Sequence, residues 1–232
     1  MTATEYAEKL RLVLQEHRNE EEAVRLSKYM RNQFEFFGLR APLSRGLVKE
    51  YIAKNGLPDQ DVLVDTIKAL WSFEEREMQI AGLYIMDKMI KNIRSSDLGL
   101  IEFMITTKSW WDSVDHIARH HAGKYFSLYP EKLGTIDTWL ESGNFWLIRS
   151  AILFQLGYKD KTNEELLSSI IERSLGSKEF FINKAIGWAL REYGKTNPAF
   201  TINFVNSHTL SPLSKREALK LLQKSMVENI EQ

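Results

Sequence analysis

The chain has 232 residues, of which 44% are hydrophobic and 27% charged, enough for a sizeable core in one or two domains or in one elongated array. It contains no cysteine, which excludes disulfides, a thiolate nucleophile and thiolate metal ligands. The formal net charge is +0, which alone argues mildly against a nucleic-acid partner, although a neutral chain can still carry a basic face.

Neither a signal peptide nor a membrane-spanning segment is expected from the sequence. Residues 1–9 carry charges where a signal peptide needs an apolar run, and no uninterrupted apolar segment is long enough to cross a bilayer. We therefore expect a cytoplasmic protein.

Nearly every segment has the apolar spacing of a helix. Leu10 and Leu14 lie on one such stretch, and Ile80, Leu83 and Tyr84 recur at helical spacing on another. Turn signals separate these stretches at residues 55–59, 95–97, 129–130, 142–144, 159–163, 176–177, 196–198 and 210–212. There is no alternating strand pattern and no glycine-rich phosphate-binding fingerprint, so the sequence predicts an all-α fold.

The helices recur with a fixed period. Arg76, Trp111, Trp146 and Phe181 follow one another at steps of about 35 residues, within the range of arrays built from helix pairs. Stacked pairs of this kind curve and present a concave surface. The period predicts a HEAT-like α-solenoid that forms a single repeat domain over residues 1–232.

The segment most suggestive of chemistry is residues 109–115, which begins a predicted helix. On a helix, Trp111 and Asp115 share a face one turn apart. The indole offers an apolar wall that attracts cations, and the carboxylate can hold a water or stabilise positive charge. A structural salt bridge or a helix cap is an equally weighted interpretation of Asp115.

The tryptophans can also be explained without a function, since an indole on an apolar stripe more often belongs to the core. Trp110 and Trp111 are adjacent, so on one helix they would point about 100° apart, one to the core and one outward. Trp188 follows Gly187, which would let another backbone or a ligand approach closely.

Arg149 is the only charge in a long apolar stretch, so it must be paired or must face an anion. Pairing with Asp115 and contact with a phosphate each satisfy this requirement, and the guanidinium shape favours phosphate. His116, His120 and His121 lack the companion motif of a zinc site, so we expect no metal there and assign them solvent-facing or phosphate-contacting positions.

Over nearly its whole length the chain resembles the AlkD-type alkylpurine DNA glycosylases, which are bacterial HEAT-like repeat enzymes. The segments that carry the resemblance are residues 29–34, 36–39, 74–77, 109–115, 146–156, 178–182, 184–193 and 212–218. The resemblance implies a duplex DNA substrate with N3- or N7-alkylated purines such as 3-methyladenine and 7-methylguanine. It also implies base excision repair on a concave DNA-binding face, without flipping of the lesion into a pocket.

The resemblance also implies roles for individual residues. Trp111 and Trp188 would pack against the sugar and backbone of the lesion nucleotide, Asp115 would stabilise the cationic sugar and position the water, and Arg149 would hold a nearby phosphate. The expected DNA-binding residues are Tyr29, Arg40, Arg45, Arg149 and Lys184. Neither a cofactor nor a metal is expected, and a monomer suits the fold.

Two competing hypotheses remain at this point. One is a non-catalytic helical-repeat module that binds DNA structure or a protein partner, and the other is a pure protein scaffold. A phosphate-binding face would give an affinity that falls steeply with salt, whereas a protein-binding groove need not.

Overall fold

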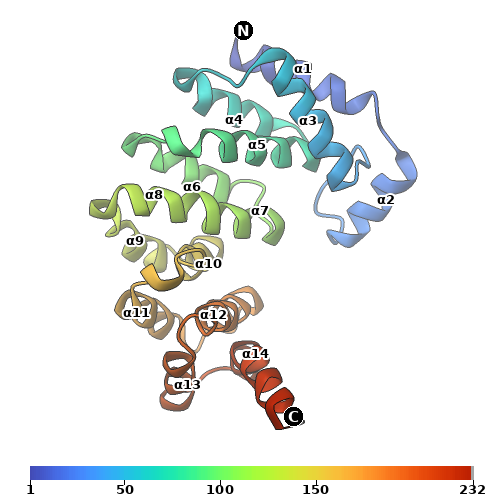
Figure 1. Cartoon of the computed structure of the whole chain (residues 1–232). Helices are drawn as coiled ribbons and strands as arrows, with labels where there is room; N and C mark the ends of the chain where they lie inside the picture. Colours follow the sequence, from blue (N-terminus) through green and yellow to red (C-terminus); the bar gives the residue numbers. More distant parts are fainter. Residues whose placement is uncertain (231–232) are drawn as a thin grey trace. The chain divides into compact units, whose positions relative to one another are not determined.

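The computed structural model describes residues 1–230 and consists of helices joined by short turns (Figure 1). Within these residues the only extended pairing is a bridge between Glu35 and Glu75, so the predicted all-α class is confirmed. None of the described helices has both the length and the apolar character needed to span a bilayer. The α-helices are α1 (Ala3–Gln15), α2 (Glu20–Tyr29), α3 (Ala41–Asn55), α4 (Leu63–Ser72), α5 (Arg76–Met89), α6 (Leu98–Thr106), α7 (Trp111–His116), α8 (Gly123–Leu128), α9 (Thr135–Glu141), α10 (Phe145–Leu153), α11 (Glu164–Ser174), α12 (Phe180–Tyr193), α13 (Pro198–Ser207) and α14 (Pro212–Ile230).

The chain divides into two compact units, Met1–Lys108 and Ser109–Gln232. The expected single repeat domain over residues 1–232 stays a prediction.

In the first unit, α1 packs against α3 and α4, and both of these helices pack against α5. The buried face of α1 contains Leu10 and Leu14, and that of α4 contains Ile67 and Leu70, at the spacing of one helical stripe. By contrast, α2 buries none of its residues. Its position depends on the loop that joins it to α3.

That loop is anchored on a buried carboxylate. Glu77, which is 1% exposed, accepts hydrogen bonds from three successive backbone N–H groups, those of Phe37 (3.1 Å), Gly38 (3.0 Å) and Leu39 (3.0 Å). Burial raises the pKa of Glu77, and the three N–H groups oppose that shift by stabilising the ionised form. No sequence pattern around Glu77 predicts this role.

At Gly38 the loop leaves no room for a side chain. Its φ is +89°, and a Cβ added there would lie 2.0 Å from the Asn19 carbonyl oxygen. Gly56 has a similar φ of +82° but nothing within 4 Å. We expect Gly56→Ala to cost about 1–2 kcal/mol for the left-handed backbone alone, and Gly38→Ala to cost roughly 1–3 kcal/mol more because of the clash. Urea denaturation of both variants measures the difference, and equal losses would contradict this account of the loop.

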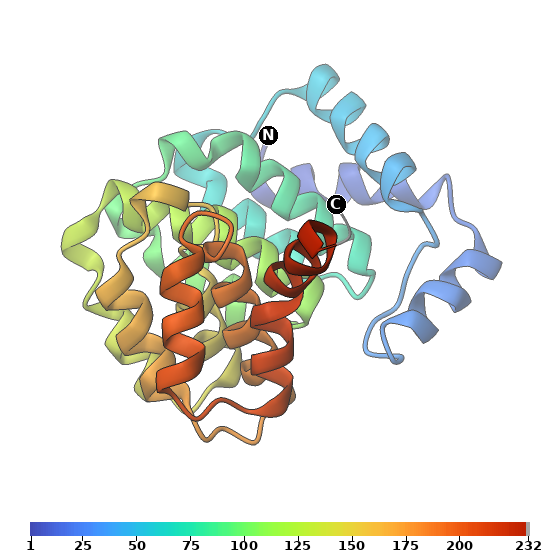
Figure 2. The same cartoon turned by 60° about the horizontal axis from the view of Figure 1, so that its bottom comes forward.

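In the second unit the helices come in successive pairs. Figure 1 shows α10, α12 and α14 following one another on one side of this unit, with α9, α11 and α13 on the other. Helix α12 packs against both α10 and α14, and Figure 2 shows α13 beside α14. This arrangement places residues one repeat apart on neighbouring helices.

The predicted period coincides with the helix starts. Arg76 and Trp111 are the first residues of α5 and α7, and Trp146 and Phe181 are the second residues of α10 and α12. Hydrogen bonds in the second unit also span about one repeat: the Tyr158 hydroxyl donates to the Gly123 carbonyl, 35 residues away. The concave solenoid as a whole stays a prediction.

Candidate functional site

The motif around Asp115 begins a helix, as predicted. Trp111 is the first residue of α7, and Asp115 follows one turn later; both are partly exposed. Trp110 differs from expectation: it is the N-cap, with extended backbone angles (φ −156°, ψ 162°), so it does not lie 100° from Trp111 around a shared helix. Its ring instead packs against Trp146 (centroids 6.0 Å apart) and Phe181 (5.6 Å).

Asp115 forms a two-pronged ion pair with Arg149 from α10. The Arg149 Nε lies 2.6 Å from Asp115 Oδ1, and the Nη2 lies 2.8 Å from Oδ2. The remaining Nη1 donates to the Phe181 carbonyl of α12, and the guanidinium carbon lies 5.8 Å from the centroid of the Phe181 ring. Of the two alternatives left open for Arg149, the structure shows pairing with Asp115; phosphate contact stays a prediction.

Exposure differs between the two partners. The Arg149 side chain is 3% exposed, whereas the Asp115 side chain is 17% exposed. The buried guanidinium of Arg149 therefore holds the Asp115 carboxylate on its buried side, while part of Asp115 stays exposed to solvent. A bidentate pair of this kind fixes the orientation of the carboxylate as well as its charge.

Burial raises the pKa of Asp115 above its ordinary value, and the nearby charge of Asp112 acts in the same direction. The hydrogen bonds and charge of Arg149 oppose the shift. The opposing contributions show why Arg149 matters: without it, burial would favour the neutral acid.

Trp188 lies on α12, next to α10, and is partly exposed. The adjacent Gly187 makes room for another backbone: an added Cβ would lie 2.7 Å from the Ser214 carbonyl oxygen and 2.5 Å from Glu217 Cβ, both on α14. The close approach foreseen at Gly187 is therefore that of α14.

Besides Arg149, two of the expected DNA-binding cations already hold carboxylates, Lys184 and Arg40. Lys184 lies 2.7 Å from a Glu217 oxygen, and Glu217, which also contacts Arg191, has a lowered pKa because of these bonds. In the first unit, the Arg40 guanidinium binds Glu22 at 3.0 and 2.6 Å. To contact a DNA phosphate, Lys184 would have to share or give up its bond to Glu217, and Arg40 its bond to Glu22.

The other two expected DNA-binding residues are on the surface of the first unit. Arg45 is exposed on α3 and forms no ion pair within residues 1–230. Tyr29 ends α2 and is 67% exposed. Tyr29 and Arg45 lie on the two helices joined by the loop that Glu77 holds, and Arg40 is the N-cap of α3 at the end of that loop, next to Leu39. We expect the relative positions of these three residues to depend on that buried acid.

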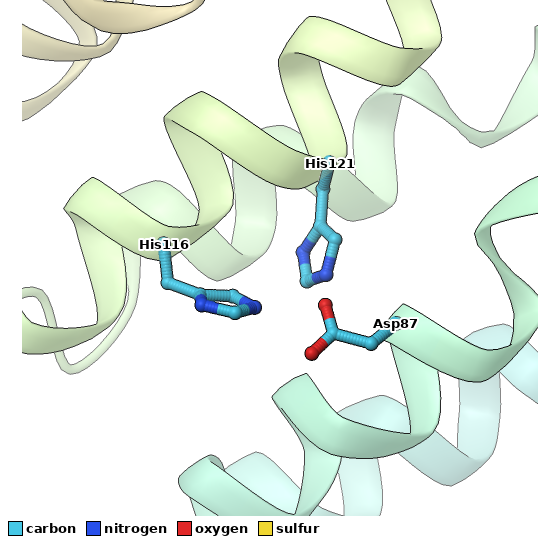
Figure 3. Close-up of side chains that lie close together, drawn as sticks. All are labelled: Asp87, His116 and His121. Carbon is cyan, nitrogen blue, oxygen red and sulfur yellow. The ribbon is translucent and has the colours of Figure 1, made fainter. Parts of the chain in front are cut away.

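One of the three histidines differs from expectation, since His120 is exposed and His116 partly exposed, but His121 is not. The helix changes from α7 into a π-helical segment, η4 (Ile117–Ala122), and Figure 3 shows the rings of His116 and His121 extending from the same side. The centroid of the His116 ring lies 4.6 Å from that of His120 and 5.3 Å from that of His121. His121 is fully buried, so the expected solvent-facing position is wrong for this residue. It lies on the π-helical segment η4, of which Ile117, Ala118 and Ala122 are also buried.

Comparisons with known proteins agree on one family. The family model described as DNA alkylation repair enzyme matches residues 10–222. A solved structure described as a predicted DNA alkylation repair enzyme from Enterococcus faecalis is 34% identical, with a TM-score of 0.80, over 88% of this chain and 95% of that one. No curated protein matches the sequence.

Proposed function

The chain belongs to the DNA alkylation repair enzyme family, and from this premise we propose that it is a monofunctional DNA glycosylase. Its proposed reaction is hydrolysis of the N-glycosidic bond of cationic N3- or N7-alkylated purines in duplex DNA, without flipping of the base into a pocket. This activity would begin base excision repair of alkylation damage.

The observation that carries the proposal is the Asp115 carboxylate, fixed by a buried arginine and partly open to solvent beside Trp111. A purine alkylated at N3 or N7 carries positive charge, so it leaves as a neutral base and takes the bonding electrons with it. Positive charge then develops on the deoxyribose. A preorganised carboxylate stabilises that charge, and it can orient the water whose oxygen bonds to C1′ as a proton is released.

The remaining residues have supporting roles in this proposal. Trp111 and Trp188 form walls beside the sugar, where their π faces attract the developing cation. Arg149 keeps Asp115 ionised and oriented. Tyr29, Arg40, Arg45 and Lys184 bind the DNA, and two of these cations exchange a carboxylate for a phosphate when they do so.

The alternative function is a non-catalytic module that binds DNA or a protein partner. The complete pairing of Asp115 with Arg149 favours it, since both carboxylate oxygens are already hydrogen-bonded. In this alternative the ion pair is only a structural link between α7 and α10.

A duplex with one 7-methylguanine separates the two functions. We expect the protein to release free 7-methylguanine and to leave an abasic strand, with a DNA affinity that falls steeply between 50 and 200 mM salt. Salt-sensitive binding without release of 7-methylguanine or of 3-methyladenine would establish the binding module instead. Absence of DNA binding would contradict the glycosylase and leave only the binding of a protein partner.

A further inference from the structure

The second unit contains a cavity of about 720 Å³ that the proposed glycosylase reaction does not use. Its lining comes from the π-helical segment η4, from α8, from the residues that follow α10 and from the start of α11. The volume is within the range of pockets that hold small molecules. Neither Asp115 nor Arg149 lines it.

Three cations from three different elements line this cavity: Arg119 on η4, Lys124 on α8, and Lys161 on η6 (Lys159–Lys161). None of the three forms an ion pair in the part of the chain that the structure describes. No aspartate or glutamate is among the described residues that line the cavity. Elsewhere in this unit arginines and lysines hold carboxylates, as Arg173 does with Glu141 at 3.0 Å. The cavity is therefore a local concentration of unbalanced positive charge, which favours an anion.

The walls between these cations are apolar and aromatic. The cavity is lined by Leu133, Tyr158 and Leu166, and also by the buried residues Phe126 and Phe154. A ligand that fits both features has a flat apolar part and a multiply charged end. Three separate cations suit a phosphate dianion better than a carboxylate with one charge, and arginine is well shaped for phosphate oxygens.

The cavity is held in a fixed shape. The Tyr158 hydroxyl donates to the Gly123 carbonyl at 2.6 Å, and burial raises the pKa of Tyr158 to about 12, so the hydroxyl keeps its proton at neutral pH. Gly123 allows α8 to approach the end of α10, since an added Cβ would lie 2.5 Å from the Phe154 carbonyl oxygen. Arg119 lies on η4, whose π-helical geometry is a feature often found at functional sites.

We propose that this cavity binds a nucleoside monophosphate, either free or as the 5′-phosphorylated end of a nucleic-acid strand. The phosphate lies among Arg119, Lys124 and Lys161, and the base lies against Tyr158, Leu133 and Leu166. The proposal is independent of the glycosylase activity, because it uses none of the residues assigned to that reaction.

Isothermal titration with adenosine 5′-monophosphate tests the proposal on the full-length protein. We expect saturable binding that Lys124→Glu and Arg119→Ala each weaken at least tenfold, with far weaker binding of adenosine and of inorganic phosphate. Lys220→Glu, which removes an exposed cation from α14, is the matched control and should bind like the wild type. Asp115→Asn should also bind normally, so failure of the glycosylase proposal would leave this result intact.

Several outcomes would overturn the proposal: no binding of the nucleotide at millimolar concentration, wild-type affinity in both cavity variants, or equal affinity for adenosine or inorganic phosphate. Circular dichroism of each variant excludes loss of fold as the cause of weaker binding. A 5′-phosphorylated dinucleotide distinguishes the two sources: tighter binding than the mononucleotide assigns the ligand to a strand end, and weaker binding assigns it to the free pool. Both results support the proposal.

Discussion

Replacement of Arg149 by alanine is expected to lower the free energy of unfolding by about 3 kcal/mol or more, because it leaves a largely buried carboxylate without its partner. The same variant loses base release, since the pKa of Asp115, already raised by burial, rises further without the opposing guanidinium. Chemical denaturation and a single-turnover assay measure the two effects.

The pH dependence of this loss has a definite sign. A carboxyl group whose folded-state pKa is raised destabilises the fold above that pKa, where the group must ionise in a buried place, and ceases to do so once both states are protonated. The stability deficit of Arg149→Ala relative to the wild type should therefore be larger at neutral pH and shrink as the pH falls through the pKa of Asp115. A deficit that is constant from pH 4 to pH 8 would contradict the pairing.

The chain offers a matched control one helix away. Arg173 contacts Asp137 and Glu141, also across about one repeat, but these partners are exposed. Exposed pairs contribute little, so Arg173→Ala should cost under about 1 kcal/mol. Adding Asp115→Asn to Arg149→Ala should restore part of the lost stability, because it removes the unpaired charge.

A neutral lesion should be released at least about 100-fold more slowly than 7-methylguanine, because a neutral base needs an acid to protonate it as it leaves, and a positioned acid supplies that much or more. Both Asp115 oxygens accept hydrogen bonds from Arg149, so the group is held as an acceptor and is not placed to donate a proton. Duplexes with one hypoxanthine or one 7-methylguanine at the same position measure the ratio. Binding of both duplexes is measured in parallel as a control. Similar release rates for hypoxanthine and 7-methylguanine would show that a group of the protein does protonate the leaving base.

Much of the fold could be predicted because helical spacing and the 35-residue period are properties of the sequence itself. The period placed Arg76, Trp111, Trp146 and Phe181 at or next to the first residues of their helices. Pairing of Arg149 with Asp115 was one of two alternatives, because Arg149 is the only charge in its apolar stretch and needs a partner.

Other features depended on contacts that the local sequence does not encode. The third partner of Arg149 is a backbone carbonyl, that of Phe181, and any residue type offers one. Gly187 signalled a close approach, but only the packing of α12 against α14 identifies Ser214 and Glu217 as its neighbours.

The burial of His121 also could not be predicted from the local sequence. His121 was expected to face solvent or a phosphate, whereas it is buried on the π-helical segment η4. Trp110 likewise precedes the helix instead of belonging to it. Local changes of backbone geometry alter which way a side chain points without changing the sequence pattern.

The most direct test of the central claim is single-turnover release of 7-methylguanine from a duplex by the wild type, Asp115→Asn and Asp137→Asn. Asp137→Asn removes an equivalent carboxylate from the exposed pair with Arg173, so it controls for loss of an ion pair. We predict release by the wild type and by Asp137→Asn, a loss of about 100-fold or more in Asp115→Asn, and similar DNA affinity for all three. Release by Asp115→Asn at the wild-type rate would contradict the assignment of the reaction to this carboxylate.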